Sequence, residues 1–450
     1  MKSVSRVTSY LLFLLIVLIP FSVRHVFDSS WNFQTGAYSD FTSLSIYISD
    51  LVLVALIGFT FLMKPKPWDI PRAWKITAVL AGAWLILVLF LQSRETLHLQ
   101  VYFSLRILFL LIFASAVSQI HVSREKLAWL FSILGAIQGL IAIFQFYFQK
   151  SVGLFILGES HLSSDTLGVA KIVSHGTKLI RSYGTFPHSN LLAAFLLVST
   201  LFNLYLLTKT NHSPRGEKIS RGEDAQPRNI LLYLALFLNI FGIFLSFSRA
   251  GILALVISAA IFIAYLLYIK GFSAVSRGMV ALAGAGIVSV LVIFPYLTTR
   301  TTISDEAVKE RVFYNHIGEK IVKNKPFFGI GPGNSVLHMK QYAKDQFQDD
   351  LKPWEVQPIH NYYLLSWAEW GIGSILLLFL IVFSIITLVK TKKESWTILL
   401  IAITSGFLVL FLFDHYFYTI WPTQLLLWLV VGLGLNTISR ETIYDTVSEK

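Results

Sequence analysis

Stretches of about twenty apolar residues recur along the whole chain, and they limit what it can fold into more than any other feature. A bilayer has a hydrocarbon core about 30 Å thick, so a helix needs roughly 20 apolar residues to cross it. Backbone polar groups inside a bilayer have to bond to one another, so such stretches cross it as helices. The twelve stretches lie at 7–23, 42–63, 74–91, 99–118, 127–149, 189–207, 229–245, 250–269, 278–297, 361–389, 396–413 and 421–438. We therefore expect an all-α, polytopic integral membrane protein with about twelve transmembrane helices.

Composition supports this expectation and excludes several classes of protein. Of the 450 residues, 55% are hydrophobic and 14% are charged, whereas a soluble domain has about 25% charged residues. We expect a single membrane domain, 1–450. The net charge of +12 does not indicate a nucleic-acid partner, because lysine and arginine lie in short loops between apolar stretches, where they orient helices. Cysteine is absent, which excludes disulfides and thiolate metal sites.

The loops carry lysine and arginine unevenly, and this predicts the orientation of the chain. Both termini and the loops on their side hold 20 of these residues, whereas the loops on the other side hold seven. The segment 298–360, with nine more, is left out of this comparison because long loops cross the membrane regardless of their charge. The side with the excess is cytoplasmic by the positive-inside rule. Both termini are then cytoplasmic, and the longer loops 150–188 and 298–360 lie on the extracytoplasmic side. The second of these is inserted between the ninth and tenth stretches.

The loop 298–360 has features of its own. Residues 306–323 place apolar side chains at helical spacing, which predicts an amphipathic helix on the outer surface. The following stretch, NKPFFGIGPGN at 324–334, lacks the Gly-Lys-Ser/Thr of a nucleotide-binding loop. Its glycines predict a chain reversal, and a backbone nest for an anion is the alternative.

Several ionisable residues lie at or inside the predicted outer boundary of the membrane, where they are costly. Arg181 precedes the sixth stretch, Arg249 occupies the short turn between the seventh and eighth, and His360 ends the loop 298–360 just before the tenth. The structural alternative for the arginines is snorkelling at helix ends, and a lone histidine is more often structural.

Three further charges lie deeper within the stretches. Asp50 and Arg106 are at similar depth, and Glu369 lies about two turns into the tenth stretch. We expect an ion pair of Arg106 with either Asp50 or Glu369, because an isolated charge there is costly. The GAIQG motif at 135–139 predicts a helix-packing face of small residues.

The boundary residues share one kind of chemistry. Two guanidinium groups match a diphosphate better than a monocarboxylate, and histidine can take a proton from an attacking hydroxyl. No DxD or HExxH cluster offers metal ligands, so we expect no metal, and arginine would have to neutralise a phosphate leaving group.

Four motifs follow one another along the chain: RSYGTFPHSNLLA at 181–193, LSFSRAG at 245–251, KPFFGIGPGNS at 325–335 and HNYYLLSWAEWGIGS at 360–374. With the twelve stretches and the large loop before the last three, the chain resembles the O-antigen ligase and polymerase superfamily of bacterial membrane glycosyltransferases. The resemblance implies transfer of an undecaprenyl diphosphate-linked glycan, at the outer face of the cytoplasmic (inner) membrane, to a glycan, glycolipid or protein acceptor. It implies that the enzyme needs no cofactor and that membrane lipid surrounds it.

The resemblance also implies roles for individual residues. His360 corresponds to the histidine that assists the acceptor hydroxyl, and Arg181 and Arg249 to the arginines that hold the lipid diphosphate, with Arg311 as a further substrate-facing arginine. Supporting positions are Asn361, Glu369 and His188. The implied reaction is a direct displacement at the anomeric carbon that inverts the linkage.

The sequence leaves some alternatives open. It does not separate a ligase, which transfers a finished glycan, from a polymerase, which joins repeat units. A secondary transporter or lipid flippase also has many spans and buried charges. In such proteins, however, the buried charges usually lie near the midplane of the membrane, and the two halves of the chain are usually repeats of each other. A purely structural scaffold gives no reason for an arginine in so short a turn.

Overall fold

The computed structural model describes residues 2–63, 70–92, 94–210, 225–297, 306–347, 351–352, 355–390 and 394–448. Most of these residues are helical. The longer helices are α1 (Lys2–Leu18), α2 (Ile48–Met63), α3 (Arg72–Leu91), α4 (Leu97–Ser118), α5 (Arg124–Phe148), α6 (Ser189–Thr210), α7 (Ala225–Leu245), α8 (Arg249–Lys270), α9 (Phe272–Leu297), α10 (Glu306–Asn324), α11 (Ser335–Phe347), α13 (Ser374–Lys390), α14 (Ser395–Phe411) and α16 (Trp421–Ser448). The shorter elements include α12 (Tyr362–Trp370), η5 (Gly371–Gly373), α15 (Tyr416–Thr419) and two antiparallel hairpins, β1 (Arg24–Val26) with β2 (Ser45–Tyr47) and β3 (Lys171–Ser174) with β4 (Thr177–Ile180).

The helices confirm an all-α polytopic membrane protein. Among the described residues, nine helices are long and apolar enough to cross a bilayer. One of them runs through α12, η5 and α13. Three shorter apolar helices, Arg6–Leu18, Ile48–Leu62 and Ser395–Phe411, lie at the remaining predicted stretches. Each of the twelve predicted stretches therefore coincides with an apolar helix.

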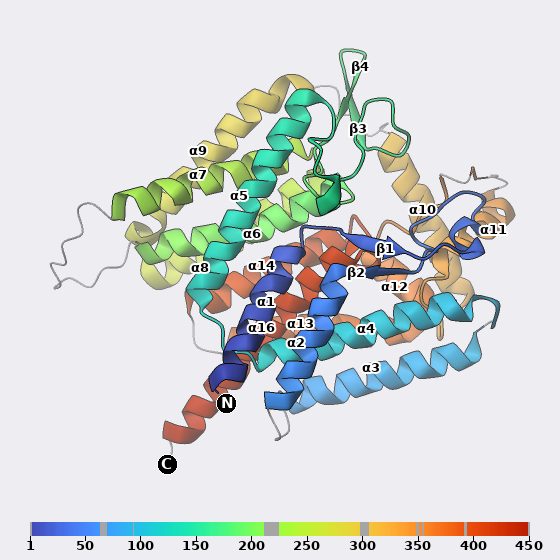
Figure 1. Ribbon diagram of the computed structural model, residues 1–450, viewed down its shortest axis with the longest axis horizontal. Coiled ribbons are helices and arrows are strands. Elements are labelled where there is room, and N and C mark those ends of the chain that lie inside the picture. Colours follow the sequence, from blue (N-terminus) through green and yellow to red (C-terminus); the bar gives the residue numbers. More distant parts are fainter. Residues whose placement is uncertain are drawn as a thin grey trace.

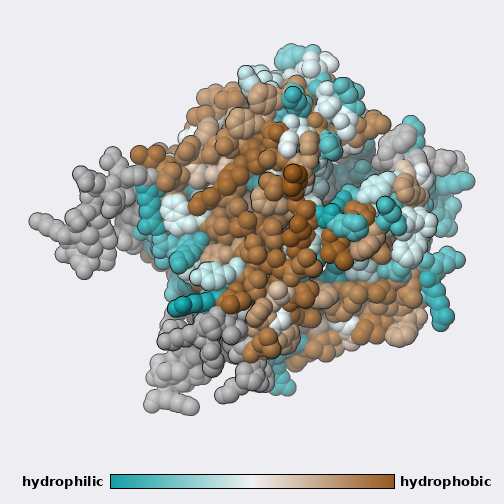
Figure 2. Space-filling view, viewed as in Figure 1, coloured by the Kyte–Doolittle hydropathy of each residue, from teal (hydrophilic) through white to brown (hydrophobic). Residues whose placement is uncertain are grey.

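The two ends of the helix bundle differ. In Figure 1 both chain termini lie at one end, at the lower left, and both hairpins, α10 and α11 lie at the top and right. Figure 2 shows apolar side chains over the flanks of the helices and hydrophilic ones around the hairpins. We call the end that carries β1–β2, β3–β4, α10 and α11 the loop face.

Helix α6 forms the centre of the bundle. The most apolar 18-residue segment of α6 is completely buried in the protein. In α3 and α9, only about a fifth of the corresponding segment is buried. The outer helices expose large apolar side chains, such as Phe90 on α3 and Leu291 on α9. In a membrane these side chains contact lipid, so the polar groups that the bundle needs lie inside it and at its ends.

The predicted small-residue packing face is present on α5. A Cβ atom added to Gly139 would lie 2.2 Å from the carbonyl oxygen of Leu238 on α7. One added to Gly135 would lie 2.4 Å from Ser199 Cβ on α6. These glycines let the backbones of α5, α6 and α7 approach closely, as small residues do in membrane helices.

Arg106 pairs with Asp50, the first of the two predicted partners. Its Nη2 lies 3.3 Å from Asp50 Oδ2 and donates to the carbonyl of Ser45 at 2.7 Å. The guanidinium also lies over the ring of Trp421, 4.2 Å from its centroid. The pair thereby ties α2 and α4 to the start of α16, and Glu369 is engaged elsewhere.

The predicted amphipathic helix is α10. It buries Ile317 and Ile321 and packs against α12, while Val312 on its other side is 47% exposed. The predicted chain reversal follows, with φ of +64° at Gly329, +91° at Gly331 and +77° at Gly333. Glycine is the residue suited to these left-handed values.

The glycine turn also forms a nest, and the anion in it is the carboxylate of Glu369. Gly333 N donates to Glu369 Oε2 at 2.7 Å, and Ser335 N donates to Oε1 at 3.1 Å. The hydroxyl of Tyr418 donates to Oε2 at 2.7 Å. Both interpretations of the turn therefore apply, and the buried charge of Glu369 fastens the loop to the bundle.

We expect Gly139→Ala to lower the free energy of unfolding by about 1–3 kcal/mol, because the added methyl group overpacks the α5–α7 contact. The measurement is thermal unfolding in detergent micelles. Gly284→Ala is the matched control, since nothing lies within 4 Å of a Cβ built there, and helix propensity alone should leave it equal or slightly more stable. Equal melting temperatures for the two variants would contradict the close approach.

We expect Glu369→Gln to destabilise the protein by about 1–3 kcal/mol, because the glutamine amide is a donor where the turn supplies only donors. The same unfolding measurement applies, with Glu319→Gln on the exposed side of α10 as control. If both variants melt together, the carboxylate does not hold the turn.

Candidate active site

The site begins with Arg181, which follows β4 and is buried. Its Nε donates to the carbonyl of Ser246 at 2.7 Å, in the short connection between α7 and α8. The backbone N–H of Ser182 donates to the carbonyl of Leu245 at 3.0 Å. The α7–α8 connection thereby fixes the position of the arginine at the loop face.

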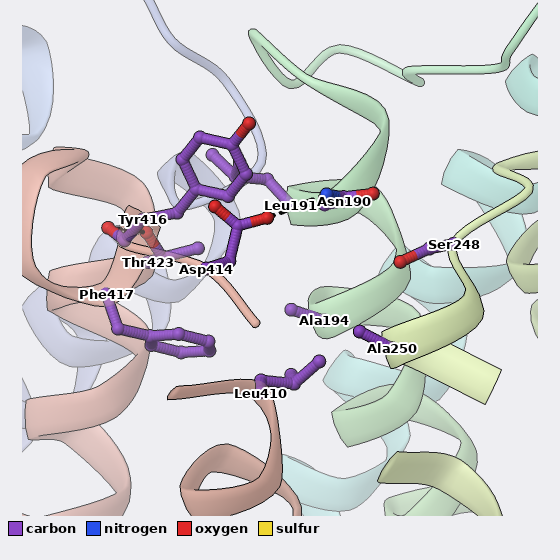
Figure 3. Close-up of a pocket in the computed structure, with 10 residues that line it drawn as sticks. All are labelled: Asn190, Leu191, Ala194, Ser248, Ala250, Leu410, Asp414, Tyr416, Phe417 and Thr423. Carbon is purple, nitrogen blue, oxygen red and sulfur yellow. Dashed lines mark hydrogen bonds between the residues drawn. The ribbon is translucent and has the colours of Figure 1, made fainter. Parts of the chain in front are cut away.

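A hydrogen-bonded chain continues from Arg181 to an acidic residue. Arg181 Nη2 donates to Asn190 Oδ1 at 2.5 Å, and Asn190 Nδ2 donates to Asp414 Oδ2 at 2.7 Å. Figure 3 shows the second bond beside a small pocket that Tyr416 also lines. Burial raises the pKa of Asp414 to about 6, against the opposing effects of Arg311 and the hydrogen bond from Asn190. Asp414 belongs to the connection between α14 and α15.

His360 lies next to this chain. Its ring stacks on Tyr314 of α10, with centroids 5.2 Å apart, and meets the ring of His415 edge-on at 4.9 Å. Burial, and secondly the charge of Arg311, lower the pKa of His360 to about 3. The imidazole is therefore neutral near pH 7 and can accept a proton.

His188 lies immediately before α6 and also belongs to the cluster. Its Nδ1 accepts the backbone N–H of Asn190 at 3.1 Å, and its ring lies 4.9 Å from that of Tyr416. Burial is the main cause of its strongly lowered pKa, followed by Arg181 and Arg311. The neighbouring arginines therefore favour neutral imidazoles in this cluster.

Arg311 reaches the cluster from α10. Its charge lowers the pKa values of His188, His360 and His415, which favours neutral imidazoles. It also lowers the pKa of Asp414, which favours an ionised carboxylate. The predicted residues Arg181, Arg311, His188 and His360 thus come together from segments far apart in the chain. The site lies between the start of α6, the α7–α8 connection, α10, the start of α12 and the α14–α16 connection.

The other predicted residues lie around this cluster. Arg249 is exposed as the first residue of α8, and its neighbours Ser248 and Ala250 line the same small pocket as Asn190 and Asp414 (Figure 3). Ser248 caps α8 by accepting the N–H of Gly251 at 3.2 Å.

Two further predicted residues, Asn361 and Glu369, belong to the α12 segment. Asn361 caps α12, accepting the N–H of Leu364 at 3.0 Å, and donates to the carbonyl of Leu412 at 3.2 Å. It therefore holds the connection that carries Asp414. Glu369 does not join the cluster, because its carboxylate binds the glycine turn.

Asp414, His415 and Tyr416 are part of the cluster but are not among the residues predicted from the sequence. Their signal was an acidic residue and a histidine side by side in the short loop between the last two apolar stretches. That loop holds no lysine or arginine, so the distribution of positive charge does not mark it. Phe41, from the connection between β1 and β2, also meets His415 edge-on, with ring centroids 5.5 Å apart.

The same cluster is the place where a metal would bind among the described residues. His360, Asp414 and His415 each offer one ligand atom, and these atoms lie within 4.8 Å of one another. The positive charges of Arg181 and Arg311 oppose a cation there, and Asp414 already accepts from Asn190 and from the N–H of His415. The arrangement is better suited to an anion that contacts the arginines.

Comparison with known proteins identifies one domain. No curated protein matches the chain. Residues 234–379, about a third of the chain, match the family model described as O-antigen ligase. The matched segment runs from within α7 to within α13 and includes Arg249, Arg311 and His360. This match confirms the resemblance indicated by the motifs: over residues 234–379 the chain carries the domain of the O-antigen ligase superfamily.

Proposed function

We propose that the protein transfers a glycan from undecaprenyl diphosphate to an acceptor hydroxyl at the loop face. The matched domain is that of ligase- or polymerase-type enzymes that make polysaccharide, and the substrate and the residue roles are our proposal. The observation that carries it is the meeting of two arginines, Arg181 and Arg311, with the neutral imidazole of His360. These are the groups needed to bind a diphosphate and to accept a hydroxyl proton.

In the proposed reaction the acceptor hydroxyl attacks the anomeric carbon of the donor. The proton of the hydroxyl moves to His360, the bond between carbon and diphosphate oxygen breaks, and the anomeric configuration inverts. The pKa of His360 is low in the empty site because of burial and Arg311. A bound diphosphate offsets the arginine charge and raises this pKa, which makes the imidazole a better base when the donor is present.

The departing diphosphate is stabilised by guanidinium groups. Arg181 is held in place through Asn190 and Asp414. Arg249 begins α8, so its side chain and the positive end of the helix dipole favour an anion at the same point. The absence of DxD and HExxH motifs and the charge of Arg311 beside His360 support a reaction without a metal or other cofactor.

The protein is a multi-pass membrane protein, and we place its loop face outside the cytoplasmic membrane of a bacterium. The excess of lysine and arginine on the terminal side supports this orientation. A donor carried by a polyprenyl lipid in the outer leaflet can then reach the site directly. A transporter is less consistent with a charged cluster at one end of the bundle than with one at its midplane.

His360→Ala should lower turnover by about 10²–10⁴-fold without unfolding the protein, because it removes the proposed base. Arg249→Ala, at an exposed position, should weaken donor binding and slow the reaction. The measurement is transfer by purified protein of undecaprenyl diphosphate-linked glycan to acceptor, with and without EDTA, and His316→Ala on the exposed side of α10 is the control. Full activity of both site variants would refute the assignment, and loss of activity in EDTA would refute the reaction without metal.

Products made of several joined repeat units would indicate a polymerase rather than a ligase.

Activity should fall as the pH drops through about 6, because protonation of Asp414 weakens its hold on Asn190 and Arg181. The folded-state pKa of Asp414 is above its ordinary value, so protonation of this group favours the folded protein, and its stabilising contribution is lost as the pH rises through about 6. Unfolding driven by Asp414 therefore cannot cause the loss of activity. The measurement is turnover against pH, in which Asp414→Asn should be less active at pH 7.5 and lack this acidic step. An unchanged step in the variant would assign it to another group.

A further inference from the structure

The turn that follows α10 exposes aromatic rings beside the helices that cross the membrane. Phe327 is 63% exposed and Phe328 is 39% exposed. The carbonyl of Pro326 accepts the indole N–H of Trp367 at 3.1 Å, and that of Phe327 accepts the N–H of Ile372 at 3.0 Å. The turn is therefore fixed to the span formed by α12, η5 and α13, and its rings are not part of the active-site cluster.

The depth of this turn follows from its contacts with α3. The Phe328 ring stacks on Trp84, with centroids 5.3 Å apart and planes 17° from parallel. Trp84 lies seven residues before the last residue of α3, Leu91, which is about 10 Å along the helix axis. Gly329, the residue after Phe328, also contacts this helix. Its carbonyl oxygen accepts a hydrogen bond at 3.0 Å from the side-chain amide of Gln92, which lies just beyond the end of α3. The Phe328 ring thus lies within the length of α3, about two helical turns from its C-terminal end, and the backbone of the turn contacts that end at Gly329.

The surroundings of the rings are those of a lipid-facing surface. On α3, Phe90 is 83% exposed and Ile86 is 53% exposed. On the other flank, Ile375 in the first turn of α13 is 58% exposed. Phe327 and Phe328 are therefore continuous with the apolar surface of the helix bundle and are not an isolated patch.

Two lysines border these rings on the side of α10. Lys323 and Lys325 are both exposed and lie two to five residues before the two phenylalanines. Trp367, 39% exposed, adds an amphipathic ring at the same edge. Tryptophan rings prefer the headgroup level of a bilayer, and lysine side chains there extend toward lipid phosphates.

We propose that Lys323, Lys325, Phe327, Phe328 and Trp367 form an interfacial anchor that binds anionic phospholipid in the leaflet at the loop face. The two phenylalanine rings enter the boundary between acyl chains and headgroups, and the two lysines contact headgroup phosphates. The anchor fixes the C-terminal end of α10, whose N-terminal half carries Arg311. This inference does not depend on the chemistry proposed for the active site.

The natural chain has no cysteine, so a single spin label can report the depth of one position. Phe327→Cys is labelled with a nitroxide in nanodiscs of phosphatidylglycerol, and collisions with oxygen are compared with those of a water-soluble nickel chelate. We expect Phe327→Cys to behave like Ile375→Cys, which faces lipid, with more collisions with oxygen. Lys344→Cys, exposed on α11, should collide more with nickel. A label at Phe327 that matches Lys344→Cys would overturn the proposal.

The lysines are tested by lipid preference. In nanodiscs of mixed composition, the wild-type protein should restrict the motion of spin-labelled phosphatidylglycerol more than that of spin-labelled phosphatidylcholine. The double variant Lys323→Gln/Lys325→Gln should lose part of this preference, whereas Lys344→Gln should keep it. An unchanged preference in the double variant would overturn headgroup binding by these lysines, whatever the depth of Phe327.

Discussion

Charge that is buried in a membrane protein must be compensated within the protein, and the loop face of this chain depends on that constraint. Arg181 is connected through Asn190 to Asp414, Arg106 is paired with Asp50, and Glu369 is held by the glycine turn. Except for the bond between Arg181 and Asn190, which are nine residues apart, these contacts join segments far apart in sequence. A buried charge among apolar neighbours finds its partner in another segment. The same contacts that neutralise charge therefore also assemble the site.

The glycine turn shows how the constraint positions function. The Glu369 carboxylate binds the turn from below, and the turn sets where α10 ends. Helix α10 in turn carries Arg311 and the Tyr314 ring on which His360 stacks. Glu369, which the resemblance placed among the supporting positions, thus lies outside the cluster and is linked to it through the loop. The proposed interfacial anchor around Phe327 fixes the same helix from the lipid side.

Much of this arrangement was predictable because its causes are local. Apolar length predicts the helices, the spacing of Ile317 and Ile321 predicts α10, and Gly329, Gly331 and Gly333 predict the turn. The partners of charges were less predictable. Asp50 and Glu369 were equal candidates for Arg106, since depth along a helix does not fix which faces meet. His415 was missed, because its contacts with His360 and Phe41 come from other segments.

The sequence alone determined that the chain folds as apolar helices, with long polar loops on one side, since both properties depend on consecutive residues and on lipid as solvent. It also placed Arg181 and His360 at the ends of those helices. Only the tertiary structure decided that Asp414 belongs with Arg181, that Glu369 occupies the nest of the turn, and that Arg249 is exposed while Arg181 is buried. The reason is physical: which helix faces meet depends on packing, such as that allowed by Gly135 and Gly139, which acts between distant segments.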